Sequence, residues 1–237
     1  MACVGGASAG PVVLAATSAP AGELDRGHAG ASAQREYLRR KRNREARVRS
    51  RHPLIGGVLL ALGGTPQHEA AFRSGRVGEE LIARSLERGT ANGRAVILHD
   101  RQMPHARGNI DHLAVAPSGV YVIDAKNISG NVSVSRRLFG PAKLKVNGRN
   151  RRGLVDGLDR QVAAVRRSLA AMDHADVPVN GVFCFTKAEL PLFGAQIRGH
   201  RLHHRRRVIK RLNGKGPLTD ESIAEIARGL AAAFGPA

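Results

Sequence analysis

Tryptophan is absent from this chain, and aromatic residues make up only 3% of it. Many proteins that hold single-stranded nucleic acid stack its bases on aromatic side chains. This chain therefore has few residues for that mode of recognition. If the chain binds nucleic acid, electrostatic attraction to the phosphate backbone has to dominate.

Cysteine is almost as scarce, with only Cys3 and Cys184 in 237 residues. The two lie far apart in the sequence and show neither a Cys-x-x-Cys nor a Cys/His spacing. This argues against a disulfide framework and against a structural zinc site. The expected compartment is the reducing cytoplasm.

Long apolar runs are also missing. The run at 53–64, PLIGGVLLALGG, is about a dozen residues long, whereas a membrane-spanning helix needs about 20. A second apolar run within 11–21 lacks the basic segment that precedes the core of a signal peptide. We therefore expect no integral membrane segment and no export.

Acidic residues are in the minority, with 19 Asp and Glu against 38 Lys and Arg, which gives a net charge of +19. Such a charge favours a polyanionic partner, either nucleic acid or an acidic membrane surface. The length allows one ordinary domain with tails. We expect a disordered tail at 1–30, a basic helix and short apolar segment at 31–65, and a folded domain at 66–237.

The segment 31–51 contains nine arginines and lysines but no glycine or proline, which predicts a helix that Ser32 can cap. One interpretation is an arm that follows phosphates and adds salt-dependent affinity; the other is a solvated basic linker. Together with 53–64 it also suits a membrane surface. The candidate nucleic-acid-binding residues of this segment are Arg39, Arg40, Lys41 and Arg42.

The most informative stretch is GNIDHLAVAPSGVYVIDAKN, residues 108–127. Its two β-branched runs, 110–116 and 120–125, flank a Pro-Ser-Gly turn and predict a hairpin. If Pro117 and Ser118 are the central turn residues, Asp111 faces Asp124 at a Cβ separation of about 4.5–5.5 Å. Because side chains alternate along a strand, Lys126 points to the same side as Asp124.

Two carboxylates that close repel each other unless a cation lies between them. Asp111, Asp124 and the carbonyl of Ala125 offer the hard oxygen ligands that Mg²⁺ or Mn²⁺ accepts. Lys126 can stabilise negative charge that develops on a phosphate. The pattern therefore indicates metal-dependent hydrolysis of phosphodiesters.

An Asp followed by a hairpin and Asp-x-Lys resembles the PD-(D/E)XK nuclease signature, and the longer string resembles the nuclease-related domain (NERD) family, over about residues 75–186. The resemblance implies an α/β fold of the restriction-endonuclease type, an αβββαβ core with a mixed central sheet flanked by helices. It also implies a metal-dependent nuclease, with DNA the expected substrate. Asp124 stands where the broad signature often has Glu, and it still offers an oxygen ligand.

The resemblance extends to two helices. GRVGEE matches a Gly-x-x-Gly-Glu pattern that places Glu79 in the site and at the metal, while Glu80 is the alternative, about 100° away around the helix. A helix expected at 154–172 carries Gln161 on its inward stripe, where it can assist the reaction and accept a hydrogen bond from Lys126. Without the resemblance, Gln161 is an ordinary buried amide.

Around these motifs the periodicity predicts a helix at 69–88, short strands at 95–98, 130–135, 143–146 and 177–186, a loop or edge strand at 198–211, and a helix at 219–234. The basic segment after the hairpin is either a rim that faces the substrate or an ordinary cationic surface. Its candidate nucleic-acid-binding residues are Arg136, Arg137, Lys143, Lys145, Arg149, Arg151 and Arg152.

The leading hypothesis is thus a metal-dependent nuclease in which Asp111, Asp124 and Glu79 hold the metal, Lys126 is catalytic and Gln161 assists. A nucleic-acid-binding module that keeps the fold without hydrolysis is the first alternative. A membrane-surface adaptor that uses the basic helix is the second.

Overall fold

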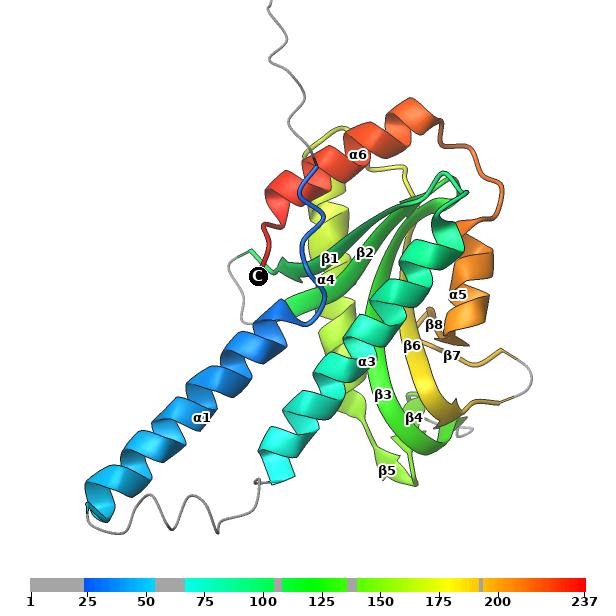
Figure 1. Ribbon diagram of the computed structural model, residues 1–237. Coiled ribbons are helices and arrows are strands. Elements are labelled where there is room, and N and C mark those ends of the chain that lie inside the picture. Colours follow the sequence, from blue (N-terminus) through cyan, green and yellow to red (C-terminus); the bar gives the residue numbers. More distant parts are fainter. Residues whose placement is uncertain (1–23, 54–66, 105–107, 136–139, 192–193) are drawn as a thin grey trace, which may run out of the picture.

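The computed structural model describes residues 24–53, 67–104, 108–135, 140–191 and 194–237. These residues form an eight-stranded sheet flanked by helices, as Figure 1 shows. The helices are α1 (Ala31–Arg51), α3 (Gln67–Thr90), α4 (Arg152–Ala170), α5 (Arg205–Leu212) and α6 (Asp220–Ala233). The strands are β1 (Val96–Gln102), β2 (Asn109–Ala116), β3 (Gly119–Ser135), β4 (Lys143–Val146), β5 (Arg149–Asn150), β6 (Val179–Glu189), β7 (Gln196–Ile197) and β8 (His200–His204).

The sheet is mixed. Its main path runs β1-β2-β3-β6-β8-β7, and β4 pairs with β3 and β5 away from this path. The pairs β1–β2, β2–β3 and β7–β8 are antiparallel, while β3–β6 and β6–β8 are parallel. A parallel pair requires a crossover, which α4 provides between β3 and β6. From α3 to β6 the order contains the predicted αβββαβ core, so the predicted fold class is confirmed.

Each face of the sheet is covered by helices. One core joins the apolar side chains of α4 and α6 to Leu113, Val122 and Phe183 of the sheet. The other joins α3 and α5 to Ile123 and Cys184. Because residues alternate between faces along each strand, a strand covered on both sides reads as a continuous apolar run. The hairpin of β2 and β3 has that pattern.

Four local predictions need correction. The strand expected at 130–135 is the continuation of β3, which runs to Ser135 after a bulge between Lys126 and Ser129. The strand expected at 95–98 continues to Gln102 as β1. The basic run 198–211 forms β8 and the amphipathic helix α5, whose Val208 and Leu212 are buried.

The fourth concerns the start of α1. Ser32 lies inside its first turn, and the N-cap position belongs to Gly30. The last helix is capped by Thr219, whose side chain accepts a hydrogen bond from the backbone N–H of Ser222. The expected tail up to residue 23, the apolar segment from residue 54 onward, and Arg136 and Arg137 lie outside the described residues.

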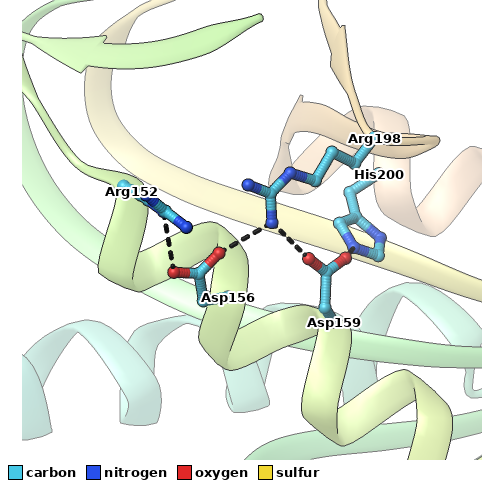
Figure 2. Close-up of polar contacts among 5 residues, drawn as sticks. All are labelled: Arg152, Asp156, Asp159, Arg198 and His200. Atoms are coloured by element: carbon cyan, nitrogen blue, oxygen red, sulfur yellow. Dashed lines mark hydrogen bonds and ion pairs between the residues drawn. The ribbon is translucent and has the colours of Figure 1, made fainter. Parts of the chain in front are cut away.

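Ion pairs hold α4 against the turn between β7 and β8 (Figure 2). Arg198 Nη1 donates to Asp156 Oδ1 and to Asp159 Oδ2, both at 2.7 Å, and Arg152 Nε lies 3.4 Å from Asp156 Oδ2. The buried His200 shares a 2.6 Å hydrogen bond with Asp159 Oδ1. Asp159 therefore joins α4 to this turn and to the first residue of β8.

We expect Asp159→Asn to lower the free energy of unfolding by about 1 kcal/mol at pH 7, because the carboxylate is partly exposed and screened. Burial raises the pKa of Asp159, but the hydrogen bonds from Arg198 and His200 outweigh it and lower the pKa below 3.8. The stabilisation by Asp159 is therefore fully present above about pH 3.8, the ordinary pKa of the group, and is lost as the pH falls through the lowered pKa.

Urea denaturation at pH 7 and pH 3 would measure this difference, with Asp176→Asn, a change in the exposed loop before β6, as the control. Equal stability of Asp159→Asn and wild type at pH 7 would show that the cluster contributes nothing.

Candidate functional site

The predicted register of the hairpin is confirmed. Leu113 pairs with Val122 and the last pair is His112 with Ile123, so Asp111 comes next, opposite Asp124. Both aspartates share a face with Leu113 and Val122, which pack against α4. Asp111 Oδ2 accepts a 2.7 Å hydrogen bond from the backbone N–H of Ala125, which ties the two strands together at this point.

The ammonium of Lys126 lies against the oxygens that the sequence predicts as metal ligands. Its Nζ donates to Asp124 Oδ1 and, at 3.2 Å, to the carbonyl oxygen of Ala125. The Asp124 side chain is only 10% exposed and that of Lys126 19% exposed. A carboxylate oxygen and a backbone carbonyl therefore converge on one cation, and here that cation is the protein's own ammonium.

Glu79 belongs to this charge cluster and Glu80 does not. Burial, together with the negative charges of Asp100 and Asp124, raises the pKa of Glu79 to about 7. Glu80 instead pairs with Arg76 at 3.1 Å and with Arg84 at 3.5 Å. Of the two glutamates that the sequence leaves open, the structure places Glu79 next to the hairpin.

The cluster contains three carboxyl groups and one ammonium group. Burial raises the pKa of Asp111 well above its usual value, and the nearby charges of Asp124 and Glu79 add to this effect, which Lys126 only partly offsets. Burial on its own would lower the pKa of Lys126, but Asp124 and Asp111 outweigh it and raise that pKa. Three carboxyl groups around one ammonium favour the uptake of a proton or of an additional cation.

The donor set fits a hard divalent cation. Across the described part of the chain, no three or more His, Cys, Asp or Glu side chains form a ready-made metal cage. Mg²⁺, however, is commonly held by one or two carboxylates and keeps several waters. Asp111, Asp124 and the Ala125 carbonyl supply such a set, and Glu79 is near enough to act on it electrostatically.

Gln161 lies on α4, as predicted, but it does not bond Lys126. Its Nε2 donates to the backbone carbonyl of Asn109 at 2.8 Å, and its buried Oε1 has no partner within the described residues. The ammonium of Lys126 bonds the carboxylate of Asp124 instead, because a charged acceptor binds it more strongly than an amide. Gln161 thus joins α4 to Asn109, which lies two residues before Asp111 in β2. Its Oε1 remains available there as a buried hydrogen-bond acceptor.

Asn127 fixes the position of α3 beside the hairpin. Its Nδ2 donates to the carbonyl of Ser74 at 2.8 Å, and its Oδ1 accepts from Thr186 Oγ1 at 2.6 Å. A Cβ on Gly78 would collide with the Asn127 side chain. Glycine at position 78 therefore lets α3 approach β3 closely enough to bring Glu79 to the cluster.

We expect Gly78→Ala to destabilise the protein by about 1–3 kcal/mol, because α3 must move away from Asn127. Gly75→Ala is the matched control, since a Cβ there meets nothing within 4 Å; it should be neutral or stabilise by about 0.5–1 kcal/mol, because alanine favours helices over glycine. Urea denaturation of both variants would measure the difference. Similar effects at the two positions would contradict the close approach at Gly78.

Asp100 is not among the site residues predicted from the sequence. It adopts φ 45° within β1 and lies opposite Asp111, because His99 pairs with His112 and Arg101 with Ile110. Its carboxylate accepts hydrogen bonds from Ser32 N at 2.6 Å, from Ser32 Oγ at 2.7 Å and from Asn109 Nδ2 at 3.0 Å. Its position opposite Asp111 depends on the full length of β1, whereas the strand predicted from the sequence ends at Leu98.

His112 lies on the opposite face of β2 from Asp111, because successive side chains of a strand point to opposite faces. It is buried, and its Nδ1 lies 2.9 Å from Nδ1 of His99, whose Nε2 lies 3.0 Å from Glu87. This pair packs beneath α3 and forms no part of the charge cluster.

The predicted basic rim is only partly described. β4 pairs with residues 132–135 of β3, beyond Lys126 on the same strand. Lys143, Arg149, Arg151 and Arg152 are exposed there, and Lys145 is partly exposed. This basic surface therefore adjoins β3, the strand that carries Asp124 and Lys126. That it binds nucleic acid stays a prediction.

Residues 74–186 match the family model described as nuclease-related domain, NERD. Neither the comparison with curated proteins nor the comparison with solved structures gave a match. The matched range begins in α3, which carries Glu79, and includes the hairpin and Gln161. It ends in β6, the strand whose Phe183 pairs with Asp124. Residues 74–186 of this chain are therefore a nuclease-related domain of the NERD family.

Proposed function

We propose that this protein is a metal-dependent nuclease that hydrolyses phosphodiester bonds, with DNA the expected substrate and RNA the other. The observation that carries the proposal is the convergence of Asp124 Oδ1 and the Ala125 carbonyl on the ammonium of Lys126, directly beside Asp111. This arrangement lies within the nuclease-related domain. It joins hard oxygen ligands to a cationic group that suits a phosphate.

Asp111, Asp124, the carbonyl of Ala125 and Glu79 would hold Mg²⁺ or Mn²⁺. A bound divalent ion supplies Lewis-acid polarisation of a phosphate oxygen and makes a bound water more acidic. The carboxylates of Asp111 and Asp124 stay in place because the backbone of Ala125 and the paired strands β2 and β3 fix them.

Lys126 has two roles in this proposal. Without substrate its ammonium neutralises Asp124; with substrate it turns to a non-bridging phosphate oxygen and stabilises the negative charge that develops there. Gln161 is a positioning residue: its buried Oε1 can accept a hydrogen bond from a water molecule, while its Nε2 remains on Asn109.

The net charge of +19 suits a polyanionic substrate. In the proposal, the phosphate backbone is held near the site by the basic residues Lys143, Lys145, Arg149, Arg151 and Arg152. Among the described residues no helix is both long enough and apolar enough to cross a membrane. We place the protein in the cytoplasm because its two cysteines suggest no disulfide framework.

The test is cleavage of plasmid DNA, linear duplex and RNA by the full chain with Mg²⁺ or Mn²⁺. Asp124→Asn, which keeps the shape of the side chain and removes its charge, should lower the rate by about 10²-fold or more. Asp176→Asn is the control for loss of one carboxylate elsewhere. Cleavage by Asp124→Asn at the wild-type rate would reject the site.

One observation favours a second function, a nucleic-acid-binding module without hydrolysis. Lys126 already neutralises the Asp124 carboxylate, so the cluster does not require a metal to be stable. Binding that falls steeply with salt, with no cleavage under any metal tested, would establish this alternative.

A further inference from the structure

Helix α1 carries a line of arginines along one side. Arg35, Arg39, Arg42 and Arg49 are spaced at i, i+4, i+7 and i+14. At about 100° per residue, all four lie within about 40° of a single line along the helix. All four are exposed. We call this set the arginine stripe.

The stripe lies on the more exposed side of α1. Three partly buried residues of the helix, Ala33, Tyr37 and Val48, lie on its opposite side. The helix α1 contacts α3, and Arg76 Nη1 of α3 donates to Gln34 Oε1 at 3.2 Å. These contacts leave all four arginines of the stripe exposed.

The first turn of α1 is anchored beside the candidate site. Asp100 accepts hydrogen bonds from the backbone and the hydroxyl of Ser32, and it lies opposite Asp111 across the β1–β2 pair. A carboxylate at a helix N-terminus bonds unpaired backbone N–H groups and complements the helix dipole. These contacts fix where the stripe begins.

Arg35 and Arg39, the first two members of the stripe, line an open pocket of about 280 Å³ together with Asn109. Asn109 is the residue whose carbonyl bonds Gln161, two positions before Asp111. From there α1 projects away from the sheet, as Figure 1 shows. The 14 residue steps from Arg35 to Arg49 span about 21 Å at about 1.5 Å per residue.

The stripe is short of negative partners. Arg39 pairs with Glu36 at 2.7 Å in an exposed ion pair, which contributes little stability and exchanges readily. Arg35, Arg42 and Arg49 form no ion pair with any residue that the structure describes. A row of exposed guanidiniums suits phosphate groups, which they bind with two hydrogen bonds each.

We infer that α1 is a phosphate track that binds the backbone of a polynucleotide extending outward from the candidate site. This inference rests on the proposed function, because it takes the scissile bond to lie at that site. At about 3.4 Å per base pair, the stripe covers about six base pairs on one side of the bond. The substrate is therefore a polymer, and small phosphodiesters do not reach the stripe. Of the nucleic-acid-binding residues predicted for this segment from the sequence, Arg39 and Arg42 lie on the stripe, whereas Arg40 and Lys41 do not. The inference adds Arg35 and Arg49 to the set.

The test replaces all four stripe arginines by glutamine in the full chain. The matched control replaces four exposed arginines on α4, α5 and α6, namely Arg160, Arg167, Arg206 and Arg228. Binding of a 30-bp duplex is measured by fluorescence anisotropy in EDTA over a range of salt. Each lost phosphate contact reduces the steepness of the plot of log K against log salt by about 0.9. The slope of the stripe variant should therefore be about 3–4 less steep than that of wild type. The slope of the control variant should change much less. The substitution of all four by lysine should restore most of the slope.

A second measurement separates this inference from the proposed function. Hydrolysis of bis(p-nitrophenyl) phosphate with Mn²⁺ reports the site alone, and the stripe variant should retain the wild-type rate. An unchanged duplex slope, or an equal loss in the control, would overturn the phosphate track. Loss of binding to vesicles containing phosphatidylserine with unchanged duplex binding would also overturn it and would assign the stripe to a membrane surface. If wild type hydrolyses neither substrate, the proposed function fails, while the duplex measurement still decides the stripe.

Discussion

Replacing Lys126 by methionine should lower phosphodiester cleavage by about 10²–10³-fold while the protein binds Mn²⁺ more tightly than wild type. Methionine has a similar length and no charge. In the wild-type protein the ammonium bonds Asp124 Oδ1 and the carbonyl of Ala125, which are the proposed ligands. Its removal frees both oxygens and removes a positive charge that repels the metal. Activity and metal affinity should thus change in opposite directions.

Isothermal titration with Mn²⁺, beside the cleavage assay, would measure both effects. Lys215→Met, a change in an exposed loop, controls for the loss of one positive charge. Asp124→Asn should lose metal binding and cleavage together. If Lys126→Met bound Mn²⁺ more weakly than wild type, the ammonium would not compete with the metal, and the proposed ligand set would be wrong.

The second large effect is on stability against pH. Without metal, the folded protein holds a proton on Glu79 with a pKa of about 7, whereas the ordinary value is 4.5. Between these values the native state binds more protons than the unfolded state, so the free energy of unfolding falls as the pH rises. A full shift corresponds to at most about 3 kcal/mol at about 1.4 kcal/mol per pH unit. Asp111, whose pKa is also raised, acts in the same direction.

Glu79→Gln isolates this contribution from other titrating groups, among them the buried His99 and His112, whose lowered pKa values act in the opposite direction. Without metal, this variant should be more stable than wild type at pH 8, and the difference should shrink toward pH 4.5. Urea denaturation in EDTA would measure it, and the matched control is Glu80→Gln. Parallel stability curves for Glu79→Gln and wild type would show that the cluster does not hold the extra proton.

Mn²⁺ should reverse the trend in the wild-type protein. A metal binds deprotonated carboxylates, so its stabilising effect grows with pH. We expect a larger shift in the melting temperature on adding Mn²⁺ at pH 7.5 than at pH 5.5. The Glu79→Gln variant should show less of this pH dependence.

The sequence by itself determined the register of the hairpin at the candidate site. A strand has a period of two, and the Pro117-Ser118 turn fixes the register, so the placement of Asp111 opposite Asp124 follows from local rules alone. The same rules place Lys126 on the side of Asp124. The helices from residues 31 and 219 were also predictable, because their periodicity and breakers are local.

Only the tertiary structure decided how the groups of the site contact one another. The ammonium of Lys126 bonds the proposed ligands, Gln161 bonds the start of β2, and Asp100 caps α1 from another strand. Each of these contacts joins flexible side chains, or elements far apart in the sequence, and depends on which buried donors and acceptors remain unpaired after packing. Periodicity carries no information on that choice, because it describes one element at a time, whereas hydrogen-bond partners in a buried cluster are chosen among all elements that meet there.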